Sequence, residues 1–186
     1  ATPFPEPGVH GEQSVDWRPD PQGLTLDSRL SLANPDWALR LGFLDQDNDP
    51  YESDGEVIRD SDVATRQGQA AIGWRPNSQL ELQLSATQLD KDYGIPNSTP
   101  ETTRIDMERD DVGLKVQLQP GFNWLDQIKL DYLDSDYLHR ETEAGRRDGL
   151  FGQEQQRAAR DFAWILGDWL GETRLGFADS ELQVCH

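Results

Sequence analysis

From Gly23 onward the sequence alternates apolar and polar residues with a period of two, the pattern of a β-strand with one apolar face. In the first run, Leu24, Leu26 and Leu30 lie on one face, opposite Asp27 and Arg29. Seven later runs follow the same rule, at residues 37–45, 65–75, 80–87, 112–119, 124–132, 161–166 and 174–177. The sequence therefore predicts an all-β chain of about eight strands.

The connections between these runs are of two kinds, which alternate along the chain. Four are short, at residues 34–36, 76–78, 120–123 and 167–170. Between them lie three long polar connections, at residues 46–63, 92–102 and 139–150. A meander with tight turns at one end and long loops at the other is typical of outer-membrane β-barrels. The predicted fold is an antiparallel meander forming all or part of a transmembrane β-barrel, with short periplasmic turns and long extracellular loops.

A soluble β-sandwich would show the same alternation, with its apolar faces turned inward. The aromatic residues favour the barrel. Four tryptophans lie in or beside the short connections and three tyrosines lie at the long-loop end, namely Trp37, Trp74, Trp124, Trp169, Tyr51, Tyr93 and Tyr137. Aromatic residues at strand ends form the interfacial girdles of membrane barrels. We interpret Tyr93 and Tyr137 as girdle residues in preference to substrate contacts.

Composition restricts the alternatives. The chain has 186 residues, only 35% of them hydrophobic, and a mean hydropathy of −0.77. It contains no run near the roughly 18 apolar residues of a membrane helix, but a barrel needs none, because only alternate residues face lipid. The net charge of −18 argues against nucleic-acid binding, which depends on Lys and Arg contacts to phosphate. A single cysteine cannot form an internal disulfide.

Two regions are predicted. Residues 1–22 hold five of the eleven prolines and indicate a Pro-rich lead-in or linker, with a short strand at residues 13–17 as the alternative. Residues 23–186 form the antiparallel β-barrel segment.

The sequence shows no catalytic constellation, so we do not expect an enzyme. His10, His139 and His186 are scattered, and the one cysteine has no partner histidine. No cofactor is expected, apart from a loosely bound calcium ion.

That calcium interpretation rests on one acidic loop. Asp45, Asp47 and Asp49, with Glu56 at the twelfth position, resemble a calcium loop, although Pro50 occupies the position where such a loop needs glycine. The default interpretation is a solvated acidic loop.

Several segments carry a resemblance to a known family. They are Lys91–Pro96 (KDYGIP), Thr103–Arg109 (TRIDMER), Leu114–Leu118 (LKVQL), Ile128–Tyr132 (IKLDY) and Ser135–Arg140 (SDYLHR). In their order and spacing they resemble the barrel of TonB-dependent outer-membrane receptors, in the branch of zinc- and siderophore-uptake receptors. The resemblance covers roughly residues 23–183.

The resemblance implies active uptake of a scarce nutrient, such as a metal chelate or a siderophore, across the outer membrane of a Gram-negative cell. The implied partners are outer-membrane lipid, a plug domain, an inner-membrane energy-transducing complex and a small nutrient ligand. No plug, coupling box or terminal aromatic strand is present, so we expect a fragment of a larger barrel. The loop after Pro96 contains no histidine, so zinc specificity is not supported.

Two alternatives stay open. One is a self-contained eight-stranded outer-membrane barrel with a structural or adhesion role. The other is a soluble, acidic, calcium-binding β-domain.

Overall fold

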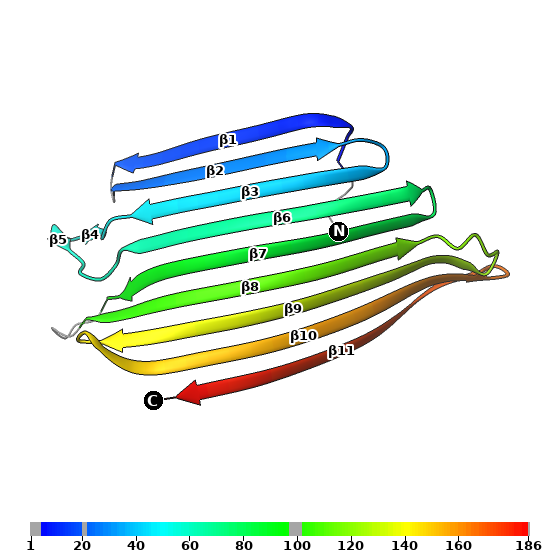
Figure 1. Ribbon diagram of the computed structural model, residues 1–186. Helices are drawn as coiled ribbons and strands as arrows, with labels where there is room; N and C mark the ends of the chain where they lie inside the picture. Colours follow the sequence, from blue (N-terminus) through cyan, green and yellow to red (C-terminus); the bar gives the residue numbers. More distant parts are fainter. Residues whose placement is uncertain (1–4, 20–21, 97–101, 186) are drawn as a thin grey trace.

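The computed structural model describes residues 5–19, 22–96 and 102–185, and these form an all-β chain. Nine strands make one antiparallel meander in which each strand lies beside its neighbours in sequence (Figure 1). They are β1 (Gly8–Pro19), β2 (Gln22–Ala33), β3 (Trp37–Asn48), β6 (Val63–Asn77), β7 (Leu80–Ile95), β8 (Thr103–Leu118), β9 (Leu125–Glu143), β10 (Arg146–Leu166) and β11 (Trp169–Cys185). A separate small hairpin pairs β4 (Glu52–Ser53) with β5 (Glu56–Val57) in the β3–β6 connection. No helix in the described residues is long and apolar enough to cross a membrane.

The predicted all-β meander is confirmed, with one strand more than the eight that the alternation indicated. The additional strand is β1, which occupies residues 8–19 of the stretch predicted as a lead-in. It contains the alternative short strand at residues 13–17 and is more than twice as long. Its twelve residues pair continuously with β2, because the prolines flank the strand or end it instead of interrupting it.

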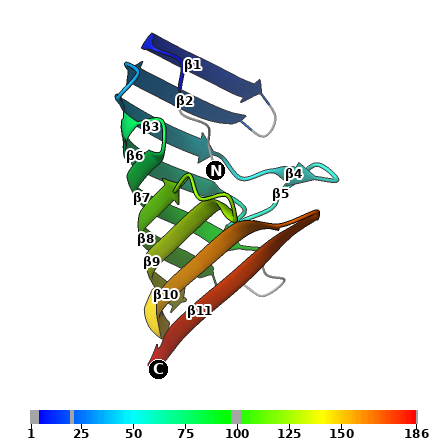
Figure 2. The same cartoon turned by 90° about the vertical axis from the view of Figure 1, so that its right-hand side faces the viewer.

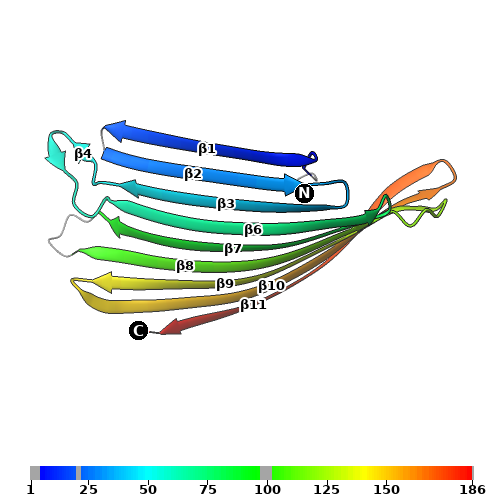
Figure 3. The same ribbon diagram turned by 45° about the horizontal axis from the view of Figure 1, so that its top comes forward.

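The sheet is a single curved layer that does not close on itself (Figures 2 and 3). Within the described residues, β1 and β11 are its edges and no second sheet covers either face. Few side chains are therefore buried, and the buried apolar ones are Ala38, Ile105 and Leu125. Pro5, just before β1, lies beside the concave residues Arg40 and Gln83, and the β4–β5 hairpin projects to the same side (Figure 2).

The short connections are true tight turns, as predicted. In the β2–β3 turn, the Asn34 side-chain oxygen accepts hydrogen bonds from the backbone N–H groups of Asp36 and Trp37, both at 2.8 Å. Asn77 repeats this arrangement in the β6–β7 turn by accepting the Gln79 N–H at 2.9 Å. Such Asx turns fix the chain reversal locally.

The long connections are shorter than predicted. The prediction of a long loop at residues 139–150 is wrong, because β9 runs to Glu143 and β10 begins at Arg146. Ala144 and Gly145 join them with φ values of 48° and 76°, as a two-residue type I′ hairpin requires. The loop at residues 92–102 is also shortened, because β7 continues to Ile95. Residues 97–101, the loop whose sequence contains no histidine, lie outside the described residues.

Candidate functional site

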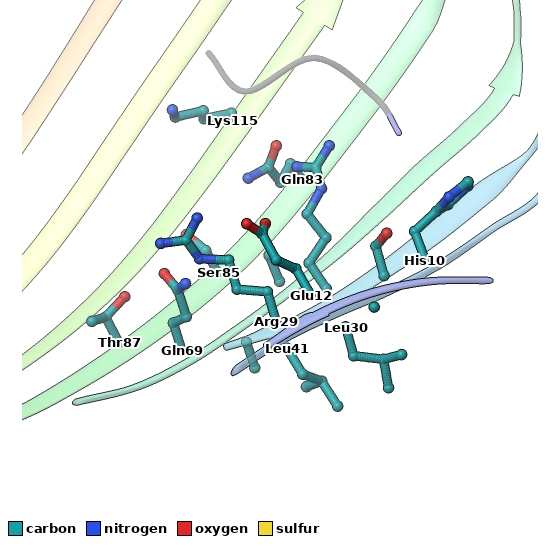
Figure 4. A pocket seen from close by; sticks show the side chains of 15 residues that line it. His10, Glu12, Arg29, Leu30, Leu41, Gln69, Gln83, Ser85, Thr87 and Lys115 are labelled. Carbon is teal, nitrogen blue, oxygen red and sulfur yellow. The ribbon is translucent and has the colours of Figure 1, made fainter. Parts of the chain in front are cut away.

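The two faces of the sheet differ in chemistry. Residues paired across neighbouring strands share a face, so the register defines rows that cross the sheet. One row is apolar on every strand and contains Val9, Leu32, Leu39, Ile72, Leu84, Leu114, Tyr132, Ala158 and Phe177. This face is convex: Leu30 and Leu41, which share its side of the sheet, point away from the concave side (Figure 4).

The concave face is polar in the same region. His10, Glu12, Arg29, Gln69 and Lys115 project into a cavity of about 730 Å³ (Figure 4). The alternation predicted for the strands is therefore confirmed, with the apolar side outward and the polar side inward. This arrangement is the reverse of a soluble sandwich, whose apolar faces meet inside.

The apolar residues of the convex face form a diagonal band, called here the apolar belt. Its upper margin lies at Trp17 on β1 and at Phe177 on β11. Followed along the register, the Trp17 end is four rows closer to the long connections than the Phe177 end. Its lower margin moves by the same four rows, from Val9 on β1 to Trp169 on β11. Because alternate residues of a strand face opposite sides, successive rows of the convex face are two residues apart. Four such rows, or eight residues, are about 27 Å along the strands, and eight inter-strand steps are about 38 Å across them. The belt therefore crosses the strands' perpendicular at about 35°, within the tilt of roughly 35–45° seen in transmembrane barrels.

Three of the tryptophans predicted for the short-turn end, Trp37, Trp74 and Trp169, lie along the lower margin of the belt. Trp37 and Trp74 are direct cross-strand partners, and Trp169 lies at the start of β11 with 76% of its surface exposed. Arg160 also lies on the convex face, where Leu130 and Leu175 flank it. It lies inside β10, one row below the upper margin, where a long side chain reaches the polar boundary.

Above the belt the polarity of the two faces is inverted. On β7 the convex face carries Gln88, Asp90 and Asp92, whereas Leu89 and Tyr93 are on the concave face. On β8 the convex residues are Asp106, Glu108 and Asp110, and the concave ones include Ile105 and Met107. The assignment of Tyr93 and Tyr137 to an outer girdle is therefore wrong, since both lie on the concave face.

Five residues of β7–β10 form what we call the upper inner cluster: Tyr93, Met107, Tyr137, His139 and Phe151. The Tyr137 hydroxyl lies 3.1 Å from His139 Nδ1. The His139 ring meets that of Phe151 edge-to-face at a centroid distance of 5.4 Å. Burial and the nearby Tyr93 raise the pKa of Tyr137, so its hydroxyl stays protonated at neutral pH.

His139 has an unusual environment in this cluster. Its Nε2 atom is buried and has no hydrogen-bond partner. Packing against Phe151 accounts for the position of the ring but leaves this nitrogen unsatisfied, and each such buried atom requires an explanation.

The connection between β3 and β6 is fastened to the upper wall. Arg104 binds the carboxylates of Asp62, at 2.9 Å, and of Asp92. The Gly94 N–H donates to the Asp62 carbonyl at 3.3 Å, and a Cβ on Gly94 would lie 2.3 Å from the carbonyl oxygen of Asp60. We call this arrangement the Arg104 clasp. It holds the loop that presents the β4–β5 hairpin on the concave side (Figure 2).

The structure does not bring the predicted calcium ligands together. Asp45 and Asp47 lie on extended β3, Asp49 follows that strand and Glu56 belongs to β5. Asp45 instead forms an ion pair with Arg66, in which Asp45 Oδ1 lies 3.7 Å from Arg66 Nε. Among the described residues, no group of three or more His, Cys, Asp or Glu side chains is placed to hold a metal ion. The geometry therefore gives the calcium interpretation no support.

No protein-family model matches this chain, and no curated protein sequence matches it. Among solved structures it is similar to one described as "Copper transporter OprC", with a TM-score of 0.70 and 16% sequence identity. The likeness is one of fold. The match covers 95% of this chain and 27% of the other, so the chain spans about a quarter of the transporter's length. The curved meander described above thus has the fold of one stretch of a transporter.

Proposed function

We propose that this chain is a wall segment of an outer-membrane β-barrel receptor that takes up a scarce nutrient. The observation that carries the proposal is the diagonal apolar belt. In a barrel the strands are tilted, so a horizontal layer of lipid meets the rows of the sheet at the tilt angle. A belt inclined at about 35°, bounded by tryptophans on its lower side, is what such a wall requires.

The position of the charges supports the same orientation. The convex acids begin directly above the belt, for example Asp110, Asp134 and Asp179 on β8, β9 and β11. Carboxylates at these places would be costly inside the hydrocarbon layer but are solvated above it. The long connections would then face the cell exterior, and the short turns the periplasm.

The uptake role rests on the concave face. In a closed barrel this face lines the lumen, and its upper part carries the aromatic upper inner cluster together with the fastened β4–β5 hairpin. The fold neighbour is named a copper transporter, which favours a metal ion or a metal chelate as the nutrient. Transport would proceed by capture at this mouth and displacement of a plug by an inner-membrane energy-transducing complex, with no bond made or broken.

The test uses the complete protein that contains this chain. Purified in detergent, it should migrate faster on a gel before heating than after, because a closed barrel resists unfolding. Cells that produce it should accumulate a limiting metal or chelate only while the inner membrane is energised. A protein that stays monomeric and folded in water without detergent would contradict the proposal.

A further inference from the structure

We propose that Met107 and His139 form a two-ligand binding site for a soft monovalent metal ion, Cu(I) or Ag(I), on the concave face above the belt. The inference deepens the proposed uptake function and rests on it only for the claim that the ion is cargo. The binding proposal itself rests on the chemistry and the pairing of the two side chains.

The His139 ring is already oriented as a ligand. Its Nδ1 lies 3.1 Å from the Tyr137 hydroxyl, and its Nε2 is buried without a partner. When Nδ1–H donates to the Tyr137 oxygen, Nε2 presents a lone pair. Histidines that bind metals are usually held in this way, with the other ring nitrogen hydrogen-bonded to an oxygen. A metal ion at Nε2 would satisfy the one buried side-chain atom that the described residues leave without a partner.

Met107 supplies the second ligand. It is the direct cross-strand partner of His139 in the β8–β9 register, so both side chains leave the sheet on the same face. Residues paired in this way have Cβ atoms about 4.5–5.5 Å apart, within reach of one ion for two long side chains. It is also the only methionine among these 186 residues.

The ligand types select the class of ion. A thioether is a soft ligand that favours Cu(I), and imidazole tolerates the same metal. Calcium and magnesium need several oxygen ligands, and a structural zinc site needs four ligands. The described residues offer no group of three or more His, Cys, Asp or Glu side chains for such ions. The two ligands therefore fit a low-coordinate d¹⁰ ion, which binds without any change of oxidation state.

The experiment uses the complete protein in detergent, labelled with methyl-¹³C methionine, and Ag(I) as the redox-inert probe. Met107→Leu identifies the Met107 methyl signal. We expect this signal to shift on addition of Ag(I), and His139→Ala to lower the affinity at least about tenfold. Tyr137→Phe, which removes only the hydroxyl that orients the ring, should weaken binding by about 10- to 100-fold. His10→Ala, on β1 of the same face, is the matched control and should leave binding unchanged.

Heat-dependent gel mobility shows that each variant has folded. An unshifted Met107 signal, or Met107→Leu binding Ag(I) as tightly as the parent protein, would overturn the site. Binding without energised uptake of the metal would confirm the site but refute the uptake function. Energised uptake of another nutrient without Ag(I) binding would overturn the site and leave the proposed function standing.

Discussion

The diagonal belt makes a quantitative prediction that a soluble sheet does not. Leu41 on β3 and Gln156 on β10 belong to the same row of the register, which also contains Ala86 and Val112. Along a row inclined at about 35°, each inter-strand step of about 4.8 Å raises the position by about 2.8 Å. Gln156, five strands from Leu41, therefore lies about 14 Å higher, more than half the height of an apolar band about 25 Å tall.

Arginine at the two positions should consequently have different effects. Leu41→Arg places a charge near the middle of the belt and should destabilise the barrel in lipid by about 2–4 kcal/mol. Gln156→Arg places the same charge at the polar boundary, beside Asp134 and Asp179, and should cost about 0–1 kcal/mol. Both variants put the same side chain on the same face and in the same row.

The assay is reversible unfolding of the complete protein in phospholipid vesicles with a chemical denaturant, followed by gel mobility. Ala86→Arg, on β7 between the two positions, provides an intermediate point and should cost less than Leu41→Arg. Equal costs for Leu41→Arg and Gln156→Arg would refute the inclined belt. A larger cost at Gln156 would refute the orientation of the strands relative to the membrane.

Two further predictions concern the Arg104 clasp. Gly94→Val should displace the loop at residues 58–62, because the valine Cβ would lie 2.3 Å from the Asp60 carbonyl oxygen. The displacement should appear as faster hydrogen exchange of residues 58–62. Gly68→Val, where an added Cβ meets nothing within 4 Å, is the control and should leave the exchange unchanged. The hydrogen bond from Arg104 lowers the pKa of Asp62, so the clasp should hold above the ordinary carboxyl pKa of about 3.9 and open as the pH falls below it. Hydrogen exchange of residues 49–62 against pH should show this opening, and Arg104→Gln should abolish its pH dependence. Because the Arg104 and Asp62 side chains are 40% and 31% exposed, the ion pair should contribute less than about 1 kcal/mol to stability.

The sequence was sufficient to predict the lower half of the wall, because one phase of alternation persists there on every strand. On β7, Leu80 to Ala86 keep the apolar side outward, and the predicted strand ended at Thr87. The strand continues for eight more residues with the opposite phase, in which Leu89 and Tyr93 are concave. A reversal of phase looks like the end of a strand when only periodicity is available.

The long polar stretch of β10 was missed for a related reason. Residues 153–160 read GlnGluGlnGlnArgAlaAlaArg, and neither of their faces is apolar enough to show alternation. Their strand is fixed by pairing with β9 on one side and β11 on the other. Pairing partners so distant in the chain are not visible in a local pattern.

The upper inner cluster could not be assembled from the sequence. Met107 and His139 lie side by side on one face only because the β8–β9 register pairs them, and a shift of one residue would turn one of them to the opposite face. The same uncertainty of parity placed Tyr93 and Tyr137 in an outer girdle. A signal was nevertheless present, since the apolar residues Leu89, Ile105 and Met107 all fall out of phase with the runs that adjoin them.

The inverted polarity above the belt also changes the meaning of the net charge of −18. The convex acids there, among them Asp90, Glu108 and Asp136, face away from the concave side, where acids such as Glu12 are balanced by bases such as Arg29 and Lys115. The negative field therefore belongs mainly to the outer rim, where salt screens it beyond about 8–10 Å. On the concave face above the belt, the aromatic, thioether and imidazole groups lie beside two bases, Lys91 and Arg109, which pair across the strands with Met107 and Tyr137. Under the proposed uptake function, selection would then depend on direct contact with these concave groups, whereas the acidic rim would raise the local concentration of cations.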